Sequence, residues 1–280
     1  MKIKITADST CDLSVEQLRQ HNIDILPLTI AMGGQTYLDG LELQPAQIYE
    51  YVDGGGELPK TSAVNIGQYA DAFEGFLKDY DAVIHLSLSS EMSSCYQNAC
   101  LAAQELENVY VVDSRNLSTG HGLLVLRAAE LAESGMDAAQ VAQQVQDTAS
   151  RVDASFILDR LEYMKKGGRC STIAVLGANL LKLKPCIEVR DGVMGVGKKY
   201  RGSYEKCLKE YITDRIAGRD DLETDRVFIT HSGVPEECLR IAEETVRQLQ
   251  SFREICITTA GCTISSHCGY GTLGVLFIRK

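Results

Sequence analysis

Four apolar, strand-like runs in this chain each end in a cluster of hydroxyl side chains. In an open α/β sheet, the carboxyl ends of the strands form the crevice in which ligands bind. Hydroxyl groups and helix N-termini at such an edge suit a carboxylate or a phosphate. Helix capping explains any single cluster, but the repetition predicts a binding site. The runs and their clusters are Ile3–Ala7 before Asp8-Ser9-Thr10, Val83–Leu88 before Ser89-Ser90 and Ser93-Ser94, Val109–Val112 before Asp113-Ser114, and Ile255–Thr259 before Thr263 and Ser265-Ser266.

Strand-like and helix-like segments alternate through the first half of the chain, which predicts a parallel sheet. We expect Lys60-Thr61-Ser62 to lie on a loop before a helix that Asn65 caps. The expected strands cover residues 3–7, 23–31, 83–88 and 109–112, and the expected helices cover 14–20, 45–52, 66–80, 93–106, 119–134 and 137–150.

The second half has a different pattern. Residues 184–190 and 193–200 flank Asp191-Gly192, a dipeptide that favours a tight hairpin turn. Helices expected over 204–217 and 235–250 are mixed with a strand at 227–230 and two closing strands. The sequence therefore predicts an α/β protein of two domains: a parallel-sheet α/β domain over residues 1–152 and a mixed-sheet α/β domain over 153–280. We expect the ligand site between them.

Charge and cysteine content narrow the classes of function. The 280 residues carry a formal net charge of -10, which argues against a nucleic-acid footprint or an anionic membrane surface. We find no apolar stretch long enough for a signal peptide or a membrane span, so we expect a cytoplasmic protein. The chain has ten cysteines but no Cys-x-x-Cys pair, so we predict neither a zinc site nor another metal site.

The residue types of a serine-type catalytic triad are present in the chain, so an enzymatic function stays open. Ser93 or Ser94, His267 and Asp8 have the residue types of a nucleophile, a base and an orienting acid. The chain lacks a Gly-x-Ser-x-Gly elbow, and helix capping explains the two serines equally well. We expect His267 in a glycine-flanked, hydroxyl-rich loop, where its imidazole can donate to a ligand oxygen.

Two arginines stand beside glycines on expected loops. Arg169 follows Gly167-Gly168, and Arg201 precedes Gly202. Each is suited to hold an anion or to face an acidic partner, because a guanidinium binds oxyanions better than an ammonium does.

A series of short motifs, in order from the first strand to the last, resembles the DegV family of bacterial fatty-acid-binding proteins. The motifs are Asp8-Ser9-Thr10 with Asp12-Leu13-Ser14, Lys60-Thr61-Ser62, Leu88-Ser89-Ser90-x-x-Ser93 with Tyr96, Val112-Asp113-Ser114, Leu161-x-Tyr163-x-Lys165-Lys166-Gly167-Gly168-Arg169, Leu183-Lys184-Pro185, Arg201-Gly202, His231-x-Gly233 and His267-x-Gly269-x-Gly271.

The resemblance implies that one long-chain fatty acid lies between two α/β domains, with its tail in an apolar tunnel. It assigns the carboxylate to Thr61 and Ser93 with His267 close by, and we include their neighbours Ser62 and Ser94 as ligand-binding candidates. It implies a carrier with no cofactor and no catalysis of its own, which presents the carboxylate to a separate fatty acid kinase. The acyl phosphate then passes to an acyltransferase of phospholipid synthesis, and Arg169 and Arg201 are candidates for contacting the kinase or the phosphorylated head group.

The chain departs from the family pattern around the expected head-group site. Ser94-Cys95 replaces the usual Gly-Thr, Ala63-Val64 replaces a frequent proline, Ser265 stands where glycine is common, and Tyr270 replaces a proline. Two alternatives therefore stay open. One is a serine-type acyl hydrolase or acyltransferase, and the other is a regulator that binds a small anionic metabolite.

Overall fold

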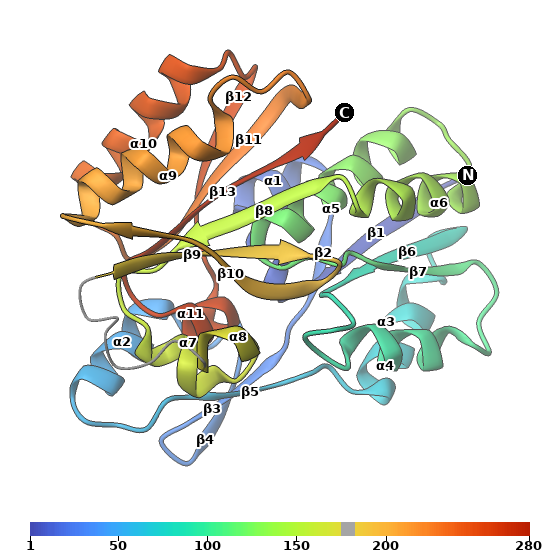
Figure 1. The fold of residues 1–280 in the computed structure, drawn as a ribbon. Helices are drawn as coiled ribbons and strands as arrows, with labels where there is room; N and C mark the ends of the chain where they lie inside the picture. The colour runs from blue at the N-terminus through green and yellow to red at the C-terminus, as the bar shows by residue number, and fades with distance from the viewer. Residues whose placement is uncertain (175–182) are drawn as a thin grey trace.

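The computed structural model describes residues 1–174 and 183–280, which form three sheets (Figure 1). The first sheet has the order β2-β1-β6-β7, and each neighbouring pair is parallel. The predicted parallel sheet is thus confirmed. Its strands are β1 (Ile3–Asp8), β2 (Asp24–Leu26), β6 (Ala82–Ser87) and β7 (Val109–Asp113).

Helices cover both faces of the first sheet. Tyr69 and Phe73 of α3 pack with Ala99 of α4 on one face. On the other face, α5 and α6 lie between this sheet and the second one (Figure 1), and their side chains share one core with both sheets. The helices of this half are α1 (Val15–Gln20), α3 (Ile66–Phe76), α4 (Cys95–Ala103), α5 (Ser118–Glu133) and α6 (Ala138–Ala149), with a short 3₁₀ turn η1 (Ser9–Cys11).

The second sheet is mixed, as predicted. Its order is β10-β9-β8-β13-β11-β12, in which β11 and β12 are parallel and the other neighbours antiparallel. Asp191 and Gly192 have φ angles of 50° and 81°, and they make the expected turn between β9 and β10. Its elements are β8 (Val152–Ile157), β9 (Leu183–Arg190), β10 (Val193–Arg201), β11 (Leu222–Ser232), β12 (Glu254–Thr259) and β13 (Thr272–Arg279), with α9 (Tyr204–Ile216) and α10 (Glu236–Leu249) on its outer face.

The third sheet corrects two predictions. The expected strand 23–31 is divided between β2 and β3 (Thr29–Met32), which belong to different sheets. Residues Lys60–Ser62, expected on a loop, form β5 and pair with β3. The hairpin partner of β3 is β4 (Gln35–Leu38), and α2 (Pro45–Asp53) follows it. Propensity misses β5 because a strand of three residues carries no periodic pattern, and its pairing with β3 alone defines it.

A short helix near the C-terminus is a further correction. We expected His267 on a loop, but it lies in the last turn of α11 (Cys262–Cys268). This helix contacts α7 (Glu162–Gly167), which precedes α8 (Ser171–Ala174), and Cys262 packs with Ile30 and Ile48 of the first half. The C-terminal helix therefore lies against elements from the first 62 residues. The division into domains at residues 152 and 153 stays a prediction.

Candidate functional site

A cavity lies where β5, the loop after β6, β10 and α11 meet, and we call it the central cavity. Its volume is about 60 Å³. Polar side chains and apolar side chains both line it, which is the composition that an amphipathic ligand requires. The lining residues are Leu28, Thr61, Ser62, Ala63, Leu88, Met92, Ser93, Leu117, Arg169, Met194, Thr263, Ile264, His267 and Cys268.

Thr61 and His267 meet in the central cavity, although 206 residues separate them in the chain. Thr61 Oγ1 lies 2.9 Å from His267 Nε2. Burial, and after it the charge of Arg169, lowers the pKa of His267 to about 4, so the imidazole is neutral at pH 7. A neutral ring with its proton on Nε2 donates to Thr61 Oγ1, which leaves the threonine proton free for another acceptor.

Ser93 lies in the same cavity but is also part of a helix start. Its Oγ accepts the backbone N–H of Cys95 at 3.2 Å, at the beginning of α4. Ser94 is the N-cap residue of that helix and does not line the cavity. The capping explanation is therefore correct for part of this cluster.

The loop that carries Ser93 is held by the buried carboxylate of Asp8. This carboxylate accepts hydrogen bonds from Tyr69 Oη at 2.5 Å, Ser87 Oγ at 2.8 Å and Leu88 N at 2.8 Å. Burial raises the pKa of Asp8, but the hydrogen bond and charge of His85 outweigh it and hold this pKa below its usual value. Asp8 thus fixes the start of the loop through its hydrogen bonds to Ser87 and Leu88.

The three residue types of the hydrolase alternative are not assembled as a triad. His267 pairs with Thr61, whereas Asp8 pairs with Tyr69, Ser87 and Leu88. Within residues 1–174 and 183–280, no hydrogen bond joins His267 to Ser93 or to Asp8. Ser93 accordingly lacks the base contact that nucleophile activation requires in this arrangement.

A second cavity, of about 30 Å³, continues from the central one toward the mixed sheet. The two cavities share Leu117, Ile264 and Cys268 in their walls. Beyond these residues, Phe156 and Leu276 line the second cavity. Apolar side chains thus form the wall that the two cavities share, and the second cavity, between α5, α11 and the second sheet, is also lined by Thr230, Ser232 and Thr272.

On its other side, the central cavity adjoins a surface depression of about 600 Å³, which we call the outer hollow. Thr61, Arg169 and His267 line both spaces. Lys60 and Lys166 add two further cations to its wall, against one carboxylate, Glu57. The polar end of the cavity therefore faces a cationic opening.

The structure brings together most of the predicted site residues. Thr61, Ser62, Ser93, His267 and Arg169 all line the central cavity. Arg201, at the end of β10, lines neither the central cavity nor the outer hollow.

Sequence reasoning named Thr263 and His267 but missed Ile264 and Cys268, the apolar part of the cavity wall that α11 supplies. Thr263 and His267 stand four residues apart, and so do Ile264 and Cys268. This i, i+4 spacing puts each pair on one helix face, and it is the signal that would have found the second pair. Leu117 and Met194 had no comparable signal.

Two acidic side chains from the first half hold the start of α11. Asp12 accepts the N–H of Gly261 at 2.8 Å, and Asp39 accepts the N–H of Cys262 at 2.9 Å. Both acids are buried, and burial raises the pKa of Asp12 to about 8, so Asp12 is largely uncharged at pH 7. Acceptor oxygens at a helix N-terminus satisfy its free N–H groups. The position of His267 thus depends on Asp12 and Asp39.

In residues 1–174 and 183–280, no group of three or more His, Cys, Asp or Glu side chains is arranged to hold a metal ion. No helix in the same ranges is long and apolar enough to cross a membrane.

The fold and the cavity define a three-sheet α/β protein with a part-polar, part-apolar interior site. A family model described as "Uncharacterised protein, DegV family" matches residues 2–280, and the chain belongs to this family. A DegV domain-containing protein of Clostridium perfringens is 36% identical over 281 residues, covering 100% of this chain and 99% of that protein. One of Clostridium acetobutylicum is 32% identical over 281 residues, with the same coverage.

Solved structures of DegV proteins have the same fold. One from Thermus thermophilus, described by its fatty acid binding, has a TM-score of 0.90 at 29% identity, and each chain is covered completely. DegV of Bacillus subtilis, described as a fatty acid binding protein, has a TM-score of 0.83 at 29% identity, again over 100% of both chains. A stearic-acid-binding protein of Eubacterium ventriosum has a TM-score of 0.81 at 26% identity, covering 99% of this chain and 98% of that one.

Proposed function

We propose that this chain is a cytoplasmic carrier of one long-chain fatty acid. The carboxylate binds at Thr61, Ser93 and His267, and the tail follows the path past Leu117 and Ile264. The observation that carries this proposal is the Thr61–His267 pair, which lines both the central cavity and its cationic opening. The fatty acid binding described for the Thermus thermophilus and Bacillus subtilis proteins supports the ligand class.

Hydrogen bonds orient the head group in this proposal, while the tail supplies most of the affinity. With His267 donating to Thr61 Oγ1, the hydroxyl proton of Thr61 points to the carboxylate. Each methylene that leaves water contributes about 0.8 kcal/mol. A neutral histidine orients the Thr61 hydroxyl and forms no buried ion pair with the acid, so the carboxylate remains available to a partner.

The tail needs more room than the two cavities offer, since their volumes are about 60 and 30 Å³. A single water molecule occupies about 30 Å³ of liquid. Met92 and Met194 line the central cavity, and methionine side chains rearrange readily because they are unbranched. The same small volume favours a second candidate function, a regulator that binds a compact anionic metabolite.

We assign phosphorylation of the carboxylate to a separate fatty acid kinase that reaches it through the outer hollow. Lys60, Lys166 and Arg169 would attract the phosphate donor and the new acyl phosphate. Arg201 lies outside the hollow and is proposed to contact the kinase surface. An acyltransferase of phospholipid synthesis would then accept the acyl group. This chain needs no nucleophile of its own, which agrees with the lack of a Ser93–His267 hydrogen bond among the described residues.

Native mass spectrometry of the freshly purified protein, followed by organic extraction, tests the ligand. We expect one long-chain acid per chain. A protein that is purified without a ligand, does not bind added fatty acids and binds a small anion would contradict the carrier function and support the regulator.

Substitution tests the head-group site. Thr61→Val with Ser93→Ala removes both hydroxyls and should abolish retention of the acid. The matched control is Thr213→Val on α9, whose hydroxyl donates to Lys209 O away from the cavity. Unchanged occupancy in the double variant would refute the assignment. Turnover of an aryl ester that disappears with His267→Ala would favour the hydrolase instead.

A further inference from the structure

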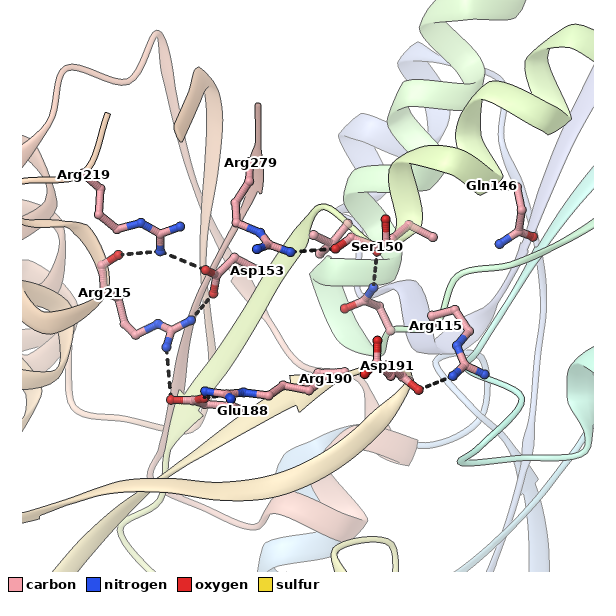
Figure 2. Close-up of a pocket in the computed structure, with 15 residues that line it drawn as sticks. Arg115, Gln146, Ser150, Asp153, Glu188, Arg190, Asp191, Arg215, Arg219 and Arg279 are labelled. Atoms are coloured by element: carbon pink, nitrogen blue, oxygen red, sulfur yellow. Dashed lines mark hydrogen bonds and ion pairs between the residues drawn. The ribbon is translucent and has the colours of Figure 1, made fainter. Parts of the chain in front are cut away.

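A second large groove lies between the two halves of the chain, and we call it the arginine groove (Figure 2). Its volume is about 570 Å³, within the range of about 300–1,000 Å³ typical of small-molecule sites. It shares no lining residue with the central cavity. The lining residues are Arg115, Asn116, Gln146, Ala149, Ser150, Val152, Asp153, Glu188, Val189, Arg190, Asp191, Gly192, Arg215, Arg219 and Arg279.

The groove is rich in arginine. Its lining contains five arginines and three carboxylates, Asp153, Glu188 and Asp191. Acids outside the lining also pair with two of the arginines: Glu91 and Asp113 with Arg115, and Asp221 with Arg219. The capacity of the groove for an anion therefore depends on the arginines that keep free donors and not on its net charge.

Two of the five arginines are occupied by carboxylates in the groove wall. Arg215 pairs with Asp153 and with Glu188 Oε1 at 3.1 Å. Arg219 pairs with Asp153 Oδ2 at 2.9 Å and with Asp221 at 2.7 Å. These ion pairs join α9 to β8 and β9, so Arg215 and Arg219 have a structural role.

Arg279 and Arg190 retain free donors. Arg279 donates to the backbone carbonyls of Ser150 at 2.6 Å and Arg151 at 3.3 Å, and within the described ranges no carboxylate lies within salt-bridge distance of it. Arg190 pairs only with Glu188, which Arg215 also holds, and its side chain is 80% exposed. Its Nη1 group makes no hydrogen bond to the described residues.

These donors surround one opening. In Figure 2, Arg279 lies above and Arg190 below the space beside Asp153, with Arg115 across from them. Arg115 donates to the carbonyl of Asp191 and pairs with Glu91 at 3.2 Å. Gln146 and Ser150 add neutral polar groups to the same wall.

We propose that the arginine groove binds a small phosphate-bearing anion. Arg279 and Arg190 donate to the phosphate oxygens from opposite sides. Planar guanidinium groups with several N–H donors match the oxygens of a phosphate. Inorganic phosphates and phosphorylated organic metabolites share this chemistry, and they differ in whether an organic part fills the rest of the groove.

Isothermal titration calorimetry at low salt tests the proposal, with inorganic pyrophosphate and AMP as separate probes. We expect the protein to bind at least one of them, and binding should weaken as salt rises because it depends on charge. Tighter binding of pyrophosphate assigns the site to inorganic phosphates, whereas tighter binding of AMP assigns it to phosphorylated metabolites. No binding of either probe at about millimolar concentration would overturn the proposal.

Variants identify the groove as the place of binding. Arg190→Gln with Arg279→Gln should weaken binding about tenfold or more, because charge-assisted hydrogen bonds are lost. If the double variant is unstable, the affinity of Arg190→Gln alone is measured instead. This variant should fold, because Arg215 still pairs with Glu188. The matched control is Arg240→Gln with Arg247→Gln, which removes two exposed arginines of α10. Equal loss in the control, or unchanged affinity in both groove variants, would refute the assignment.

Discussion

A methyl group added at Gly167 should impair the proposed head-group site without the substitution of any proposed ligand-binding residue. Gly167 ends α7, and a Cβ there would lie 2.6 Å from His267 Nδ1. Contacts below 3.0 Å are essentially never observed, and ordinary contact begins at 3.4 Å. The imidazole must therefore move by about 0.8 Å, the difference between 3.4 and 2.6 Å. The φ angle of Gly167 is outside the left-handed region, so alanine strains no backbone there.

The displacement acts on binding through the hydrogen bond between His267 and Thr61. Loss of that bond costs about 1 kcal/mol, and an off-rotamer imidazole costs about 0.5–1.5 kcal/mol. The strained rotamer destabilises the free and the ligand-bound protein alike, so the weaker binding comes from the lost hydrogen bond, and about 1 kcal/mol corresponds to roughly fivefold. We expect Gly167→Ala to approach the affinity of His267→Ala.

Displacement of a fluorescent fatty acid measures this effect. The matched control is Gly75→Ala, a helical glycine in α3 whose added Cβ meets nothing within 4 Å. Wild-type affinity in Gly167→Ala would refute the reasoning that the position of His267 controls the head group. A loss of affinity in Gly167→Ala but not in His267→Ala would show that the collision acts elsewhere.

Three further predictions concern stability and tail length. Burial lowers the pKa of His267 from 6.5 to about 4, so the unfolded chain binds the proton more tightly; stability is fully present above pH 6.5 and is lost as pH falls toward 4. The difference in unfolding free energy between the wild type and His267→Asn should change by about 3 kcal/mol between pH 7 and 4, and a constant difference would contradict the buried neutral imidazole. Asp8→Asn should lower the unfolding free energy by about 3 kcal/mol in urea, because an amide donor would face the donors that surround Asp8; a change below about 1 kcal/mol would show that this network is dispensable. Ile264→Ala should cost about 2–5 kcal/mol of stability and widen the passage between the two cavities, so mass spectrometry should detect longer or bulkier acids, and an unchanged acid would place the tail elsewhere.

The large elements were predictable because their signals are local. The alternation of apolar runs and amphipathic segments gives the parallel sheet, and Asp191-Gly192 gives the hairpin turn. The expected helix over 66–80 ends earlier, at Phe76, as helix ends are the least determined by pattern.

The third sheet and α11 could not be predicted in the same way. The strands β3, β4 and β5 have three or four residues each, and α11 has seven. Segments this short owe their structure to the elements they contact rather than to propensity.

The candidate site was partly predictable: its motif residues could be named from the sequence, but the contacts between them could not. Thr61 and Ser93 stand in recognisable motifs, but only the folded chain shows that Thr61 meets His267 across 206 positions. Ser94 does not line the central cavity, and a sequence does not show which of two adjacent serines points inward. Leu117 and Met194, which form part of the apolar wall of the central cavity, come from separate segments. No sequence pattern in either segment predicts that the two side chains line the same cavity.

The capping of α11 by Asp12 and Asp39 has a consequence for the order in which the proposed site forms during synthesis. Asp39 leaves the ribosome 223 residues before Cys262, the first residue of the helix that it holds. Until that helix is made, the two acidic side chains lack its N–H donors, and Thr61 lacks its imidazole partner. A nascent chain therefore completes the proposed head-group site only after α11 has been synthesised and has packed against these earlier residues.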